Sequence, residues 1–232
     1  MSNEPLTSGL LQAYQQLSSC IVASAIETFG VRMKNTGFTH PEVRCIFEDL
    51  PTMVGYAATA RIRSAEPPME GRSYYKRTDW WNQLQTIPEP RVVVIEDIDG
   101  NKGLGAFIGE VHATILKALG CVGLVTNGGV RDLHKVHALG FQMFAGNVSV
   151  SHAYSHVFDF GGTVEVGGMR VQPGDLLQGD THGVQTVPAS IAPLVPEVAA
   201  RLLAKRKAMV ACCLAPGFSV EKLRKTVEEL ER

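Results

Sequence analysis

The chain has too little charge of one sign, and too few long apolar runs, to belong to several large classes of protein. Its formal net charge is −1, and the nearest basic cluster, residues 201–207, is short and predicted to be the solvated face of a helix. Because phosphate contacts need clustered lysine and arginine, nucleic acid is not an expected partner. No apolar run approaches the length of a membrane span, so we expect no membrane partner.

The chain also lacks the cysteine pattern of a disulfide framework. The five cysteines are an odd number, and two of them, Cys212 and Cys213, are adjacent. Residues 1–10 lack the basic and apolar regions of a signal peptide. Free thiols in a reducing compartment fit this pattern, and we therefore expect a cytoplasmic protein.

Helical and strand patterns alternate along the 232 residues, which predicts a single α/β domain over residues 1–232. Apolar spacing predicts four helices, over residues 10–29, 110–120, 136–139 and 219–230. Compact or alternating apolar runs predict four strands, over residues 55–63, 91–100, 121–126 and 141–145. A hairpin-rich region is expected after them.

The stretch between residues 64 and 82 is predicted to be irregular, because it contains two prolines and a glycine. Its aromatic residues are Tyr74, Tyr75, Trp80 and Trp81. They could form a lid over an active site. Adjacent bulky aromatics are more often buried, however, so a subunit contact or plain core is the preferred interpretation.

The most informative segment runs from Glu110 to Asp132. A short helix is followed by a buried strand over residues 121–126, and Asn127-Gly128-Gly129 then turns the chain. Arg131 and Asp132 should therefore lie just past the carboxyl end of that strand, where open α/β sheets bind their ligands.

These side chains suit one kind of substrate. Arg131 offers a planar donor fork for a carboxylate or a developing enolate oxygen, and Asp132 is a hard oxygen ligand for Mg or Mn. A cation chelated by an α-keto acid would act as a Lewis acid, and the arginine would stabilise the enolate that forms when a C–C bond breaks.

An acidic residue, twenty intervening positions and an Arg-Asp pair resemble the signature of the RraA-like family. Here these are Glu110, Arg131 and Asp132. The likeness extends to KALG at the end of the helix, to NGGVRD, to HALGF and to TVEVGGMRVQPGDLLQGDTHGVQTVP. It covers about residues 17–201 and leaves a helical tail at about 202–232.

The resemblance implies a fold and a function. The fold would be a single α/β domain of the swivelling β/β/α type, with a central sheet and flanking helices, assembled as trimers or dimers of trimers. The function would be that of a metal-dependent class II pyruvate aldolase, a lyase acting on 4-hydroxy-4-methyl-2-oxoglutarate or 4-carboxy-4-hydroxy-2-oxoadipate, with oxaloacetate decarboxylation as a side activity. The alternative is a protein-binding regulator of a ribonuclease. An older label, a demethylmenaquinone methyltransferase, lacks support from any S-adenosylmethionine loop.

The resemblance also implies roles for individual residues. Asp132 matches the direct metal ligand, Glu110 the acid that holds metal-bound water, and Arg131 the residue that binds substrate and stabilises the enolate. The backbone amides of Glu110, Val111 and His112 match the region that receives the substrate carboxylate. Helix amino termini offer free N–H groups and a favourable dipole to anions, which supports that last role independently.

Three positions depart from the family pattern. Glu110 replaces the usual aspartate, Lys135 stands where an acid is common, and His182 occupies the place of an aspartate.

Other residues could also take part in a site. Glu96, Asp97 and Asp99 lie at the end of a predicted strand, where a solvated strand end is preferred over metal binding. His152 and His156 have the spacing of one helical face and could bind zinc, but no third ligand follows at motif spacing.

Overall fold

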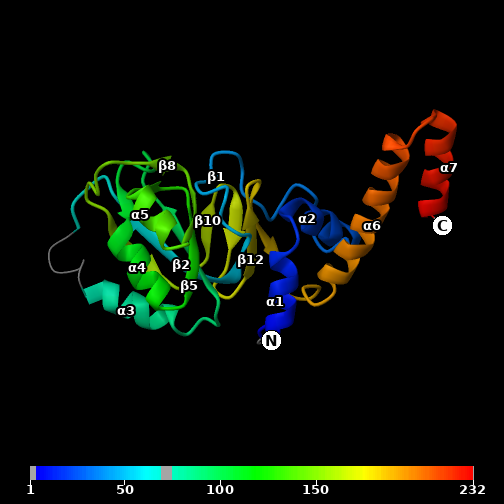
Figure 1. The fold of residues 1–232 in the computed structure, drawn as a ribbon. Helices are drawn as coiled ribbons and strands as arrows, with labels where there is room; N and C mark the ends of the chain where they lie inside the picture. The colour runs from blue at the N-terminus through cyan, green and yellow to red at the C-terminus, as the bar shows by residue number, and fades with distance from the viewer. Residues whose placement is uncertain (1–3, 69–74, 232) are drawn as a thin grey trace.

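The computed structural model describes residues 4–68 and 75–231 (Figure 1). Its centre is an eight-stranded sheet in the order β1-β7-β5-β3-β2-β12-β13, with β9 also pairing with β2. The strands are β1 (Arg44–Cys45), β2 (Met53–Arg63), β3 (Arg91–Asp97), β5 (Cys121–Thr126), β7 (Gln142–Ala145), β9 (His156–Phe160), β12 (Leu176–Asp180) and β13 (Gly183–Val187). Strands β2, β3, β5 and β7 are parallel, and the others pair antiparallel.

Two smaller sheets complete the β-structure of the described residues. Strands β4 (Ala106–Ile108), β6 (Gly129–Val130) and β8 (Asn147–Val148) form a parallel three-stranded sheet in the order β4-β6-β8. Strands β10 (Val164–Val166) and β11 (Met169–Val171) form a hairpin. With the β12–β13 hairpin, this agrees with the hairpin-rich region expected from the sequence.

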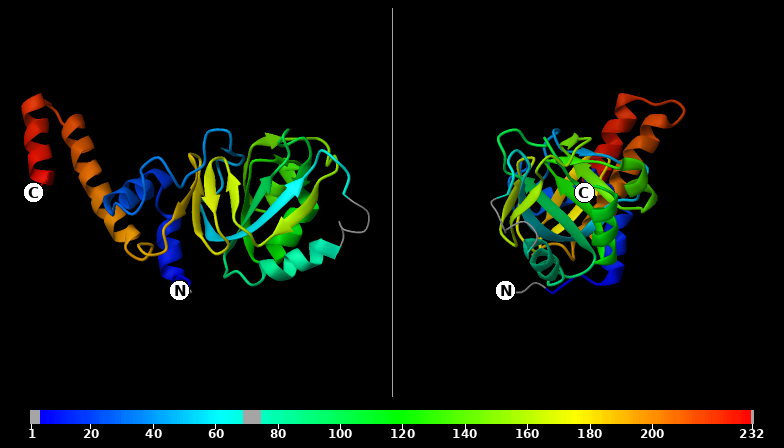
Figure 2. Two further views of the ribbon diagram at one scale, coloured as in Figure 1. Left: turned by 180° about the vertical axis from the view of Figure 1, so that it is seen from behind. Right: turned by 90° about the vertical axis from the view of Figure 1, so that its left-hand side faces the viewer.

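The helices fall into two groups at opposite ends of the molecule (Figures 1 and 2). Helices α3 (Tyr75–Leu84), α4 (Glu110–Ala118) and α5 (Leu133–Ala138) lie at one end. At the other end, α1 (Ser8–Gln15) and α2 (Ser19–Thr28) pack with the start of α6 (Val195–Leu214), and α7 (Val220–Glu231) folds back on α6. Among the described residues, none of these helices has the length and apolar character needed to cross a membrane.

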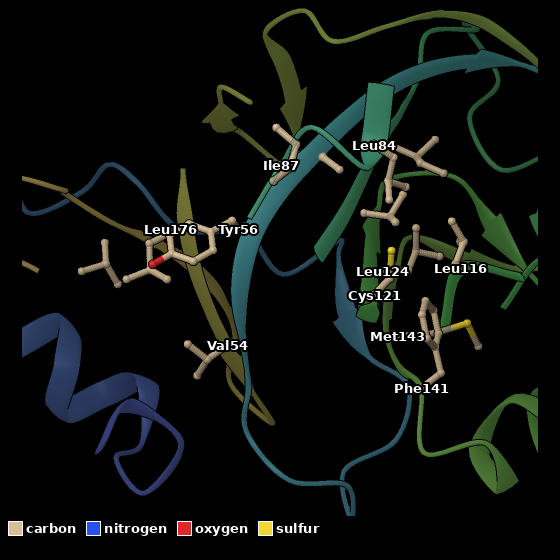
Figure 3. Packing of buried hydrophobic residues seen from close by; sticks show 14 of the residues in the cluster. Val54, Tyr56, Leu84, Ile87, Leu116, Cys121, Leu124, Phe141, Met143 and Leu176 are labelled. Atoms are coloured by element: carbon tan, nitrogen blue, oxygen red, sulfur yellow. The ribbon is translucent and has the colours of Figure 1, made fainter. Parts of the chain in front are cut away.

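The core follows the central strands because their side chains are apolar on both faces. Residues 92–95 of β3 are all at most 1% exposed, which explains why this strand reads as a continuous valine-rich run. Figure 3 shows the packing around Leu116 of α4, Leu124 of β5 and Met143 of β7. Cys121 belongs to the same cluster, and burial raises the pKa of its thiol to about 12, so it is inert packing as the sequence indicates.

The α/β fold class predicted from the sequence is confirmed, with two corrections to its elements. The single helix predicted over residues 10–29 is wrong, because Ser18 caps a second helix by accepting the N–H of Ile21. The stretch 64–82 is not wholly irregular, because α3 occupies its second half. Trp80 is buried in the core at 1% exposure, whereas Tyr74 lies outside the described residues.

Candidate functional site

The three-stranded sheet brings the beginnings of two helices together. Strand β4 ends at Ile108 and leads through Gly109 into α4, and the neighbouring parallel strand β6 ends at Val130 and leads into α5. The backbone N–H of Arg131 donates to the carbonyl of Ile108 over 3.0 Å, which fixes the two strand ends side by side.

This arrangement corrects one detail of the sequence prediction. Arg131 and Asp132 do not follow β5 directly, because the two-residue strand β6 lies between β5 and Arg131. They therefore stand at the carboxyl end of the small parallel sheet rather than of the main one. The physical reason for placing a ligand site there is unchanged, since parallel strands again direct two helix amino termini to one edge.

Asp132 joins the two helices. It is the N-cap of α5, in the left-handed region at φ 56° and ψ 37°, and its side chain makes no capping bond to its own helix. Instead its Oδ2 accepts the backbone N–H of Glu110, the first residue of α4, over 3.1 Å. Gly109, the N-cap of α4, has no side-chain acceptor for the first turn of the helix, and Asp132 supplies one from the neighbouring element.

Arg131 lies beside this carboxylate with its terminal nitrogens available. Its Nε is buried, 3.5 Å from Oδ2 of Asp132, and makes no hydrogen bond. Within residues 4–68 and 75–231, no hydrogen bond occupies its Nη1 or Nη2, and 30% of the side chain is exposed. The guanidinium fork can therefore receive a carboxylate or an enolate oxygen.

Glu110 is turned towards Lys135, whose Nζ lies 3.4 Å from Oε1 of the glutamate. Both side chains are well exposed. The lysine that departs from the family pattern is therefore paired with the glutamate that also departs from it. A cation held by water at Glu110 would share that carboxylate with Lys135.

A cavity of about 300 Å³ opens at Arg131 and Asp132, but Glu110 does not line it. Its size suits a small organic acid. Its lining includes apolar residues (Trp81, Val111 and Ile115) and polar ones (Arg131, Asp132, His112 and His152). The ring of His112 is stacked on Phe107, with 5.0 Å between the centroids. The amide of Val111, at the second position of α4, has no hydrogen-bond partner in the described part of the chain.

Two of these cavity residues were not predicted to act in the site. Trp81, for which the sequence favours a subunit contact or core over an active-site lid, is partly exposed: it packs against the core and also lines the cavity. For His152 the sequence suggests only zinc binding together with His156. The structure places His152 in a loop and His156 at the start of β9, so no helix presents them on one face.

The acids at the end of β3 accept backbone N–H groups, that of Glu165 in the case of Glu96, and none of the three lines the cavity. Asp97 is fully buried, which corrects the solvated strand end expected there, and its carboxylate accepts the N–H groups of Asp99 and Gly103. Burial alone would raise the pKa of Asp99, but bonds from the N–H groups of Ser64 and Ala65 outweigh it and lower that pKa.

The donor set at the cavity fits a loosely held hard cation. No cluster of three or more His, Cys, Asp or Glu side chains suited to a metal occurs in the described ranges, so a closed structural site is not formed. Asp132 supplies one carboxylate that is 39% exposed, whereas the Glu110 carboxylate is paired with Lys135, does not line the cavity and could contribute only through water. Magnesium commonly binds through one or two carboxylates with the rest of its shell from water and substrate oxygens, so these residues fit Mg or Mn.

Comparison with known proteins gives a family and a set of similar folds. A family model described as RraA-like, Aldolase/RraA, matches residues 19–185. A protein of Halalkalibacterium halodurans, provisionally named a 4-hydroxy-4-methyl-2-oxoglutarate aldolase, is 26% identical over 137 residues. The match spans 59% of this chain and only 60% of the length of that relative.

Two solved structures have the same fold. An uncharacterized protein from Pseudomonas syringae pv. tomato aligns with a TM-score of 0.74 at 19% identity, over 97% of both chains. RraAS2 of Streptomyces coelicolor, described as an unusual member of the RNase ES inhibitor RraA protein family, aligns with a TM-score of 0.69 at 21% identity, over 88% of this chain and 96% of that one. At such identities the likeness concerns the fold.

Proposed function

We propose that this chain, which belongs to the RraA-like family, is a divalent-cation-dependent lyase. Its substrate would be a 4-hydroxy-2-oxo acid, cleaved to pyruvate and a second oxo acid, with decarboxylation of oxaloacetate as a side activity. The observation that carries the proposal is the convergence of Arg131, Asp132 and the amino terminus of α4 on one cavity.

Substrate binding follows from the charges at that convergence. The carboxylate of the 2-oxo acid would lie at the start of α4, where the Val111 amide and the helix dipole favour an anion. Glu110 and His112 belong to the same turn, although the Glu110 amide already donates to Asp132. The apolar side formed by Trp81 and Ile115 would contact the carbon skeleton.

The residues that would hold Mg or Mn are Asp132 directly and Glu110 through water. When bound, the cation supplies Lewis-acid polarisation of the 2-oxo group. Arg131 lies beside Asp132 and would stabilise the negative charge on the enolate oxygen as the C3–C4 bond breaks. A lysine there would provide only a point charge, so we expect Arg131→Lys to lower kcat strongly.

The resemblance and the cysteines also support an assembly and a location. We propose a homotrimer or a dimer of trimers, in keeping with the family likeness seen in the sequence. A cytoplasmic location is proposed because all five cysteines are free thiols.

A pyruvate-release assay tests the proposed activity. Purified protein is given 4-hydroxy-4-methyl-2-oxoglutarate, 4-carboxy-4-hydroxy-2-oxoadipate and oxaloacetate, each with Mg, with Mn and with EDTA. We expect pyruvate with at least one hydroxy-oxo acid and with oxaloacetate, and no product in EDTA. Turnover that persists in EDTA would contradict the role of the cation.

The alternative, a protein-binding regulator of a ribonuclease, shares the fold and predicts a different outcome. Its signature would be no pyruvate from any of the three compounds, together with direct inhibition of a purified ribonuclease. The cavity and the terminal nitrogens of Arg131, which make no hydrogen bond in the described part of the chain, favour the lyase, because together they offer a binding site to a small organic acid.

A further inference from the structure

His152 is held in place by backbone contacts to β4. Its Nδ1 lies 2.9 Å from the carbonyl oxygen of Ala106, and the N–H of Ala106 donates to the carbonyl of Ser151 over 2.8 Å. Both backbone groups of one strand residue therefore fix the segment that carries the histidine. The same strand leads into Gly109 and α4, so His152 is tied to the element that forms the substrate end of the cavity.

The local backbone is unusually restrained. Ala153 has a φ of 46°, in the left-handed region that a non-glycine residue rarely adopts. A Cβ on Gly105 would lie 2.2 Å from the carbonyl oxygen of His152, so the loop packs against the strand as closely as a glycine permits. This close packing fixes the backbone of His152, and the bond from Nδ1 to the Ala106 carbonyl orients the exposed ring.

The hydrogen bond to Ala106 determines which ring nitrogen carries the proton. A carbonyl oxygen can only accept, so Nδ1 of His152 must be the donor. In the neutral ring Nε2 is then a bare acceptor, and it has no hydrogen-bond partner in the described part of the chain. Because His152 lines the cavity with Arg131 and Asp132, the ring supplies a proton acceptor there.

The other polar groups in or near the cavity make other contacts or cannot accept a proton. Asp132 accepts the Glu110 amide and is the proposed cation ligand, and the Glu110 carboxylate is paired with Lys135. His112 is stacked on Phe107. Arg131 is a permanent cation and cannot take a proton.

We propose that His152 is the catalytic base that takes the proton from the C4 hydroxyl of the substrate. The inference rests on the proposed lyase function. As Nε2 takes the proton, the O–H electron pair becomes the new carbonyl bond of the released oxo acid. The C3–C4 pair moves to C2=C3, and the C2 oxygen carries the enolate charge beside Arg131. The proton on Nε2 then returns to C3, directly or through water, and gives the methyl group of pyruvate. No further reagent is needed.

The test compares two reactions that the same cavity would catalyse. Cleavage of 4-hydroxy-4-methyl-2-oxoglutarate requires removal of a hydroxyl proton, whereas loss of carbon dioxide from oxaloacetate does not. In His152→Asn, the amide nitrogen keeps a donor for the Ala106 carbonyl but removes the accepting Nε2. We expect kcat for aldol cleavage to fall by about 10²- to 10⁴-fold, as is typical for loss of a general base, with oxaloacetate decarboxylation largely retained.

His156→Asn is the matched control, because its Nδ1 also contacts a backbone carbonyl, that of Tyr154, over 2.7 Å, but it does not line the cavity. It should keep both activities. Retained decarboxylation in His152→Asn also reports that the variant is folded.

Selective loss of aldol cleavage in His152→Asn supports the proposal. Equal loss of both reactions would assign His152 a supporting role in the shape of the site and overturn it, and so would unchanged aldol cleavage. If the wild-type protein catalyses neither reaction, the proposed lyase function fails, and the role of His152 fails with it. The wild-type assay alone therefore separates the two failures.

Discussion

At the scale of single residues, the site depends on the backbone conformation of Asp132. A left-handed φ of 56° turns its carboxylate away from its own helix and towards α4. Asparagine tolerates this region at least as well as aspartate, whereas alanine does not. This difference allows charge and backbone strain to be tested separately.

We expect Asp132→Asn to abolish cation-dependent pyruvate release while leaving the free energy of unfolding nearly unchanged. Asp132→Ala should abolish activity too, and lower that free energy by about 1–2 kcal/mol through the left-handed strain. Activity assays and urea unfolding of both variants are the measurements. Wild-type turnover in Asp132→Asn would show that the carboxylate does not hold the cation.

The pair formed by Glu110 and Lys135 leads to a second prediction. If Glu110 holds cation-bound water, Glu110→Gln should weaken cation affinity roughly ten- to hundredfold, as changes around a metal ligand typically do. Lys135→Met should change affinity in the opposite direction, since it removes the cation that competes for the same carboxylate. Metal titrations of pyruvate release measure both. Identical titrations for all three proteins would reduce Glu110 to an acid that stabilises a helix start.

At the scale of elements, the site requires the amino termini of α4 and α5 to approach closely. Gly109 makes this approach feasible, because a Cβ there would lie 2.4 Å from Oδ2 of Asp132 and 3.0 Å from Cγ of Arg131. We expect Gly109→Ala to displace both side chains and to lower kcat/KM at least about 100-fold, as misplacement of about 1 Å can do.

Gly100→Ala is the matched control for that substitution, since a Cβ at Gly100 meets no atom within 4 Å and its φ is not in the left-handed range. It should keep activity. Retention of full activity in Gly109→Ala would mean that the two helix starts can separate without loss of function.

A different carboxylate ties α2 to the main sheet. Asp180, the last residue of β12, accepts the N–H and the hydroxyl of Ser19 over 2.7 Å each, and the N–H of His182 over 2.9 Å. Burial alone would raise the pKa of Asp180, but these bonds outweigh it and lower the pKa below its ordinary value. His182, which departs from the family pattern, thus takes part in an anchor of the fold.

Because the folded pKa is depressed, ionised Asp180 stabilises the fold above the ordinary carboxyl range, and this contribution is lost as pH falls through the folded pKa. We expect Asp180→Asn to lower the free energy of unfolding by about 1–3 kcal/mol at pH 7, with a smaller difference below about pH 4. Urea unfolding across pH is the measurement. Asp175→Asn is a control for which the pH dependence of stability should have the opposite sign, since burial raises the pKa of Asp175. A pH-independent difference for Asp180→Asn would contradict the assignment.

The elements that the sequence predicted are those with a long, regular pattern. The helix at 110–118 and the strand at 121–126 have clear apolar spacing and a glycine boundary. Strand β6 has only two residues, which is too short for any periodicity to appear. Apolar spacing continues across the break between α1 and α2, so periodicity predicts one helix there, and only the serine cap marks the break.

The same distinction applies to the site. Glu110, Arg131 and Asp132 follow local signals, a glycine turn and a helix start, so their approach could be predicted. Trp81 and His152 reach the cavity through pairing between distant elements, such as the contact of His152 with Ala106. No local sequence pattern predicts such a contact. An aromatic pair is equally compatible with core or interface, and a histidine pair with a zinc site.

At the scale of the whole molecule, the cavity and the last two helices lie at opposite ends (Figure 1). The hairpin of α6 and α7 extends from the body beyond α2, and none of the described residues of α7 is buried. We still propose that the core ends at about residue 201 and a helical tail follows. Helix α6 runs across that point without a break. Because of this separation, the hairpin could contact only the cavity of a neighbouring copy of the chain, not its own.

The outer surface of the hairpin exposes apolar side chains that a folded monomer leaves in water. Val210, Leu214 and Val220 are 57%, 80% and 68% exposed. Burying two such side chains in an assembly would contribute roughly 3–6 kcal/mol per protomer as an upper estimate. The proposed trimer or dimer of trimers offers a reason for apolar residues at these positions.

The double substitution Val210→Glu with Leu214→Glu should therefore lower the solution mass while leaving the protomer folded by circular dichroism, because neither side chain belongs to the core. Lys207→Glu is the matched control, since it changes the charge of the same helix by the same −2 at an exposed polar position and should leave the mass unchanged. Analytical ultracentrifugation measures the mass of each protein. An unaltered trimer or hexamer in the double variant would show that the hairpin lies outside the contacts between copies, so that the assembly must be held by the body of the fold alone.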